Sequence, residues 1–184
     1  AWEARAGRGA LAGTDPNAVH HVVFTSGTTG EPKGVMHTQN TMQSTIYRLI
    51  DRLEFSDRDV VLMASTLGHQ TGYLYGYCLT MLLGATAVWL DVWSAAEGAR
   101  LIETEGVTFT MGATPFLRDL TYTDARRDMG SLRLFISAGA PIPRPQVRDA
   151  RARLCCAISA GWGMTENGLA TCNGLRGTEE KVVG

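Results

Sequence analysis

The chain has 184 residues, a formal net charge of −1 and 45% hydrophobic residues, which is typical of a soluble globular domain large enough to bury a core. The 17 basic and 18 acidic residues nearly balance, so the sequence favours neither nucleic acid nor an anionic membrane surface as a partner. The four cysteines form no CxxC pair, which argues against a zinc site and a disulfide framework. We therefore expect reduced thiols and a cytoplasmic protein.

Two stretches have an unusual composition, and we interpret them before we consider the expected strands and helices. Residues 1–13 are rich in Gly, Ala and Arg and lack the apolar core of a signal peptide, so we interpret them as a linker or a segment edge, with the domain segment at 14–184. Residues 64–90 contain no charged side chain and imitate a membrane span. Gly72 and Gly84 divide this stretch into a helix, a turn and a strand, and we reject a span.

Strand and helix signals alternate along the chain. Strands are expected at 19–25, 59–65, 86–90, 107–111, 132–137 and 156–160, and helices at 40–53, 72–83, 94–106, 115–122 and 145–154. Asn40 with Gln43, and Ser94 with Glu97, have the spacing of capping boxes at two helix starts. This alternation predicts an α/β fold with a mainly parallel sheet and helix crossovers.

A loop rich in glycine and hydroxyl side chains follows the first strand. It reads Thr25-Ser26-Gly27-Thr28-Thr29-Gly30-Glu31-Pro32-Lys33-Gly34. Backbone N–H groups, hydroxyls and one ammonium of such a loop can all face a polyphosphate. A Walker A loop would need Gly at position 32 and Ser or Thr at position 34, so that motif fails. A simple hairpin turn is the alternative, but it leaves the Pro-Lys-Gly ending unexplained.

Two later motifs give this loop its context. They read Ser137-Ala138-Gly139-Ala140-Pro141 and Trp162-Gly163-Met164-Thr165-Glu166. Together with the loop they resemble three ordered motifs of the adenylate-forming (AMP-binding) superfamily, which includes acyl-CoA synthetases, luciferases and nonribosomal-peptide adenylation domains. Trp162 stands where many members carry Tyr, and Gln39 stands where His is frequent. The resemblance covers the chain except for residues 1–13.

The resemblance implies a role for each motif. The nucleotide would contact Thr25, Ser26, Gly27, Thr28, Thr29, Gly30, Lys33, Gly139, Ala140, Pro141, Trp162, Gly163, Met164 and Thr165. Trp162 offers a stacking face for adenine, Thr165 a hydroxyl for the α-phosphate, and Glu166 a carboxylate for Mg²⁺. Lys33, Thr165 and Glu166 are the expected catalytic group. We expect all three loops at the carboxyl ends of parallel strands. Taken alone, Trp162 would rather indicate a core aromatic and Glu166 could be a solvated charge, and only the three motifs together favour the nucleotide site.

The resemblance also indicates where the carboxylate substrate binds. His69 would line its tunnel, with a satisfied structural histidine as the alternative. Residues 112–116 would form another wall, or an ordinary strand-to-helix turn. Amino-acid-activating members place an Asp in the region of residues 62–90, which here contains no acidic residue. A carboxylic acid with an apolar tail is therefore favoured.

The implied reaction is ATP-dependent activation of a carboxylic acid to acyl-AMP, followed by transfer to coenzyme A, with Mg²⁺ as the metal. An adenylation module that loads a carrier protein and a non-catalytic nucleotide-binding fragment remain as alternatives. Family members continue to a ribose-binding Asp, a hinge and a mobile C-terminal domain, none of which occurs in this sequence. We therefore expect this segment alone to be inactive, and an open sheet edge to favour its self-association.

Overall fold

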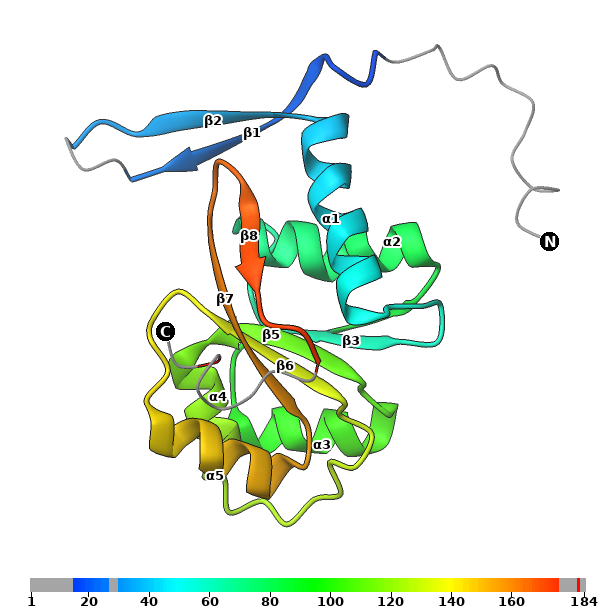
Figure 1. Cartoon of the computed structure of the whole chain (residues 1–184), viewed down its shortest axis with the longest axis vertical. Coiled ribbons are helices and arrows are strands. Elements are labelled where there is room, and N and C mark those ends of the chain that lie inside the picture. Colours follow the sequence, from blue (N-terminus) through cyan, green and yellow to red (C-terminus); the bar gives the residue numbers. More distant parts are fainter. Residues whose placement is uncertain (1–14, 27–29, 176–181, 183–184) are drawn as a thin grey trace, which may run out of the picture.

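The computed structural model describes residues 15–26, 30–175 and 182, so the interpretation of residues 1–13 lies outside it. It contains an antiparallel pair, β1 (Val19–Thr25) and β2 (Lys33–Thr38), and a six-stranded sheet in the order β4-β3-β5-β6-β7-β8 (Figure 1). The strands of this sheet are β3 (Val60–Met63), β4 (Thr86–Trp89), β5 (Phe109–Ala113), β6 (Leu134–Ala138), β7 (Ala157–Met164) and β8 (Gly168–Cys172). All are parallel except β8, which confirms the predicted fold class.

The strand order reverses beside β3. From β3 the chain passes through the π-helix η1 (Gly72–Cys78) and α2 (Leu79–Leu83) to β4, then returns through α3 (Ala95–Glu105) to β5 on the other side of β3. Right-handed crossovers in opposite directions place their helices on opposite faces of the sheet. The gap between the carboxyl ends of β3 and β5 is therefore a topological switch point, where open α/β sheets bind ligands.

Helices cover both faces of the six-stranded sheet (Figure 1). One apolar cluster joins the sheet to α3, α4 (Thr114–Thr121) and α5 (Arg144–Leu154), and the other joins it to α1 (Gln39–Leu53), η1 and α2. Along β3, Leu62 packs in the first cluster while Val61 and Met63 pack in the second. This alternation follows the two-residue period of a strand. No helix of the described residues is long and apolar enough to cross a membrane.

The helix starts and one helix type differ from the sequence-based expectations. The N-cap of α1 is Thr38, whose hydroxyl accepts from the Thr41 N–H (3.2 Å), so the predicted Asn40–Gln43 box is wrong. Ser94 does cap α3, but the Glu97 carboxylate pairs with Arg100. The predicted helix at 72–83 begins as the π-helix η1.

Two strands were missed by the sequence analysis, and both are antiparallel. Lys33–Thr38 forms β2, so the glycine-rich loop is the turn of a β1–β2 hairpin and stands outside the parallel sheet. The expectation that this loop follows a parallel strand is therefore wrong, because the strand before it pairs with β2 in an antiparallel hairpin. Gly168–Cys172 forms β8 and pairs with β7.

Candidate functional site

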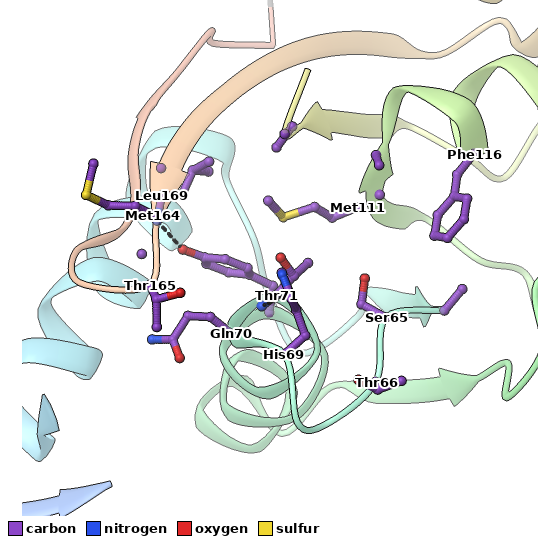
Figure 2. Close-up of a pocket in the computed structure, with 18 residues that line it drawn as sticks. Ser65, Thr66, His69, Gln70, Thr71, Met111, Phe116, Met164, Thr165 and Leu169 are labelled. Carbon is purple, nitrogen blue, oxygen red and sulfur yellow. Dashed lines mark hydrogen bonds between the residues drawn. The ribbon is translucent and has the colours of Figure 1, made fainter. Parts of the chain in front are cut away.

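A cavity of about 530 Å³ opens at the switch point, at the carboxyl ends of β3, β5, β6 and β7 (Figure 2). Its wall contains residues that directly follow or end these strands, including Ala64, Ala113, Gly139 and Thr165. No Asp, Glu, Lys or Arg of the described chain lines it. The cavity therefore suits a ligand part without charge.

One side of the cavity is apolar. Met111, Phe116 and Leu169 contribute to it (Figure 2). The Phe116 ring stacks on Trp93, with centroids 4.6 Å apart and an interplanar angle of 25°. A Cβ on Gly112 would lie 2.6 Å from the Phe116 ring, so only glycine lets the ring occupy this wall. Residues 112, 113 and 116 thus lie where the resemblance expected a wall.

The opposite side carries polar groups, among them His69. The Nδ1 atom of His69 accepts a hydrogen bond from the Thr71 N–H (3.1 Å), so the neutral ring carries its proton on Nε2. His69 is exposed and lines the cavity, which leaves this N–H available to a ligand. The ring can therefore donate a hydrogen bond to a ligand that enters the cavity.

The Gly139-Ala140-Pro141 turn follows β6 directly, as predicted. Gly139 has a φ of 87°, a left-handed conformation that favours glycine, and it lines the cavity. Ala140 and Pro141 are exposed beside it. The Thr114 hydroxyl donates to the Ala140 carbonyl (3.1 Å), which ties the turn to the start of α4.

The third motif lies differently from the expectation of a loop after a strand. Trp162, Gly163 and Met164 belong to β7 itself, and only Thr165 and Glu166 lie in the turn to β8. Gly163, Met164 and Thr165 line the cavity, whereas Trp162 and Glu166 do not. Trp162 is 57% exposed, so it is not a core aromatic.

The loop that was expected to bind phosphate connects β1 to β2. Thr25 pairs with Lys33 at the end of the two strands, and Lys33 is exposed. Ser26 and Gly30 are exposed, and Gly30 has a φ of 89°. Gly27, Thr28 and Thr29 lie outside the described residues. None of the described loop residues lines the cavity, so a ligand would have to reach from the cavity to the hairpin.

Two contacts connect the β1–β2 hairpin to the rest of the chain, one to the turn after β7 and one to η1. His37 of β2 places its Nε2 2.8 Å from the Thr165 carbonyl oxygen. His21 of β1 stacks on Tyr73 of η1, with centroids 4.3 Å apart and an interplanar angle of 5°. Burial, together with the neighbouring His37 and His20, lowers the pKa of His21. Neither docking histidine belongs to a sequence motif that would have indicated this role.

The described residues also allow a test of the implied Mg²⁺ site. They contain no cluster of three His, Cys, Asp or Glu side chains that could hold a metal. Mg²⁺ at a nucleotide is ordinarily held by one or two carboxylates, phosphate oxygens and water. Glu166 is exposed in the turn beside Thr165 and fits this mode.

Comparison with known proteins places these features in a family. The chain matches the AMP-binding enzyme family over residues 3–184. It is 37% identical over 148 residues to the medium-chain fatty-acid–CoA ligase of Escherichia coli K12, covering 79% of this chain and 26% of that protein. It is 31% identical over 158 residues to 4-coumarate–CoA ligase 5 of Oryza sativa subsp. japonica, covering 81% and 29%.

Solved structures agree with the fold. The ATP-bound structure of MatB from Rhodopseudomonas palustris superposes with a TM-score of 0.82 at 26% identity, covering 93% of this chain and 34% of that one. The N-terminal domain of FACL13 from Mycobacterium tuberculosis superposes with a TM-score of 0.79 over 88% of this chain. The chain spans 26% to 34% of the length of the two ligases and MatB. Its three motifs, its sheet and these matches agree: the chain belongs to the AMP-binding enzyme family.

Proposed function

We propose that the complete gene product containing this chain uses ATP to activate a carboxylic acid with an apolar tail and then transfers the acyl group to coenzyme A. The observation that carries this proposal is the uncharged cavity at the switch point, with the His69 N–H and Thr165 on its polar side. The named functions of the two matched ligases support coenzyme A as acceptor.

In the first step a substrate carboxylate oxygen attacks the α-phosphorus of ATP, and the bond from that phosphorus to the pyrophosphate oxygen breaks. In the second step the thiol sulfur attacks the acyl carbon, loses its proton, and AMP leaves. No side chain of this protein needs to form a covalent bond, so its contribution is alignment and charge neutralisation.

The proposed roles divide between the hairpin and the cavity. Lys33 and the loop amides would bind the phosphates, and Thr165 would donate to the α-phosphate at the cavity edge. The Nε2–H of His69 would orient the substrate carboxylate. Mg²⁺ held by Glu166 would supply charge neutralisation at the phosphates.

The chemistry of the cavity limits which carboxylic acids can bind in it. An ammonium or a second carboxylate placed in an uncharged cavity would lose hydration without gaining an ionic partner, which costs several kcal/mol. Amino acids and short dicarboxylates are therefore poor substrates in this proposal. This argues against an amino-acid adenylation module as the parent enzyme.

Acid-dependent release of pyrophosphate from ATP tests the proposal. The complete gene product should release it with octanoate or an aryl propenoate, and far more slowly with malonate or phenylalanine. Mass detection of the acyl thioester then shows whether coenzyme A is the acceptor. Folded protein that gives no acid-dependent pyrophosphate with any of these acids would refute the function, and selective turnover of phenylalanine would refute the substrate class.

A further inference from the structure

His37 is a buried histidine that the three motifs do not use. It lies in β2, four residues after Lys33, and is 4% exposed, whereas its neighbour Met36 is 68% exposed. The inward face of β2 thus carries an imidazole at the junction with the β7–β8 turn. Its Nε2 lies 2.8 Å from the carbonyl oxygen of Thr165, a residue 128 positions later in the chain.

The partners of His37 determine its tautomer. A carbonyl oxygen only accepts hydrogen bonds, so His37 Nε2 must carry a proton and donate it to Thr165. The side-chain nitrogen of Gln70 lies 3.4 Å from the same Nε2, which would set two donors face to face. The Gln70 oxygen is buried and has no hydrogen-bond partner among the described residues. Turning this amide over places its oxygen beside the His37 N–H and removes the conflict.

We propose that His37 is a positioning residue. Its Nε2–H donates a hydrogen bond to the Thr165 carbonyl and so fixes the β7–β8 turn, which presents Thr165 to the cavity and Glu166 to the metal at the phosphates. This inference rests on the proposed function, because it concerns the ATP that the turn and the hairpin would share. Gln70 is the second acceptor that keeps the imidazole in this orientation.

The location of His37 explains why the site needs such a contact. Lys33 lies in β2, whereas Glu166 lies in the turn from β7 to β8, and in the described part of the chain β1 and β2 pair with no strand of the six-stranded sheet. Lys33 and His37 share one strand and are about 13 Å apart along it. Anchoring His37 to Thr165 therefore sets the distance between Lys33, the proposed phosphate ligand, and Glu166, the proposed metal ligand, and errors of about 1 Å in such distances are costly.

A pair of substitutions separates positioning from packing. His37→Leu fills the space but removes the donor, whereas His37→Gln retains an N–H that reaches the Nε2 position. On this chain we expect His37→Leu to weaken the binding of ATP with Mg²⁺ about tenfold, and His37→Gln to restore it to within about threefold. A glutamine variant as weak as the leucine variant would overturn the proposal, because packing would then explain the loss.

A double-mutant cycle tests whether His37 acts through the turn. If it does, His37→Leu should weaken ATP binding less in a Glu166→Gln background than in the wild-type background. Equal losses in the two backgrounds would show that His37 stabilises the chain without acting on the turn, and would overturn the proposal.

Two measurements do not depend on ATP and separate failure of this inference from failure of the proposed function. Nitrogen NMR of the unmodified chain should show His37 as the Nε2–H tautomer. Hydrogen exchange at the Asn167 amide, which donates to the Met164 carbonyl (3.2 Å) within the turn, should accelerate in His37→Leu and recover in His37→Gln. An Nδ1–H tautomer, or unchanged exchange in a folded leucine variant, would overturn the inference even if ATP binds. Absence of ATP binding by the complete gene product would count against the proposed function only.

Discussion

Replacement of Gly72 by Ala should disable the proposed acid site while leaving the sheet folded. A Cβ at this position would lie 2.2 Å from the Thr66 carbonyl oxygen and 2.5 Å from that of Ser65. Ordinary carbon–oxygen contacts are about 3.4 Å, so the backbone of one segment must move by about 1 Å. The displaced segment is the loop between β3 and η1, which carries His69 and Gln70 on the cavity wall.

The size of the effect follows from this displacement. Both clashing atoms are backbone, so no side-chain rotation relieves the contact, and we expect a loss of about 1–3 kcal/mol in the free energy of unfolding. A misplacement of about 1 Å at a site that works by alignment costs about 100-fold in rate. The rate loss should therefore exceed what the fraction of unfolded protein explains.

Gly68→Ala is the matched control. It lies in the same loop, but its Cβ would meet only the Thr66 hydroxyl oxygen, at 3.9 Å. The assay is acid-dependent pyrophosphate release by the complete gene product, with melting temperatures measured on the same preparations. A Gly72→Ala enzyme that works within threefold of the wild type, or one no slower than Gly68→Ala, would refute the link between this close approach and the site.

Two further substitutions probe the metal ligand and the cavity wall. Glu166→Gln should slow pyrophosphate release by about 100-fold or more without changing the melting temperature, because it removes the anion proposed to hold Mg²⁺. Glu105→Gln, at another exposed glutamate, is its control, and equal rates for the two variants would reject the assignment. Phe116→Ala should deepen the cavity and shift the preference toward longer acids, by about fourfold in kcat/KM for each additional methylene that becomes buried. An unchanged chain-length profile would show that Phe116 does not limit the substrate.

The elements of the parallel sheet could be predicted because their sequences are governed by burial. β3, β5 and β6 are short apolar runs, and α1 carries its apolar residues on one face, so periodicity locates them to within a few residues. β2 and β8 were not predicted because neither has the apolar run or the alternation that indicates a strand. β2 begins with the Lys-Gly end of the glycine-rich loop and exposes Met36, so its apolar pattern is weak, and β8 begins with Gly168 at a φ of 63°.

Only those parts of the candidate site that depend on local sequence patterns could be predicted. The rule that ligands bind at the carboxyl ends of parallel strands predicted that Gly139 and Thr165 would lie at one edge of the sheet, and both line the same cavity. His69, which the resemblance assigned to the substrate tunnel, lines that cavity too. The bond from His37 to Thr165 joins residues 128 positions apart, and that from the Leu169 N–H to the Tyr75 hydroxyl (2.6 Å) joins residues 94 apart. Pairings over such distances depend on the assembled fold, and no spacing in a single sequence encodes them.

Docking of the β1–β2 hairpin should weaken in mild acid because of His21. Its pKa is lowered by burial against Tyr73 and by the nearby imidazoles of His37 and His20, so the docked hairpin binds a proton less readily than the free chain does. The contribution of neutral His21 to the free energy of hairpin docking is therefore fully present above the ordinary pKa of about 6.5. It declines as the pH falls from there toward the lowered pKa.

Because His21 stacks on Tyr73, a substitution can separate the effect of the His21 charge from that of its aromatic ring. His21→Phe keeps an aromatic ring against Tyr73 but has no proton to bind. The protection of the hairpin amides, expressed relative to the intrinsic exchange rate at each pH, should therefore fall less between pH 7.5 and 5 than in the wild type. His20→Gln, which removes the exposed neighbouring imidazole, should retain most of the wild-type pH dependence because burial is the largest cause of the His21 shift. If His21→Phe and the wild type lose hairpin protection equally over this range, another group controls docking, and the assignment of the acid-sensitive step to His21 is wrong.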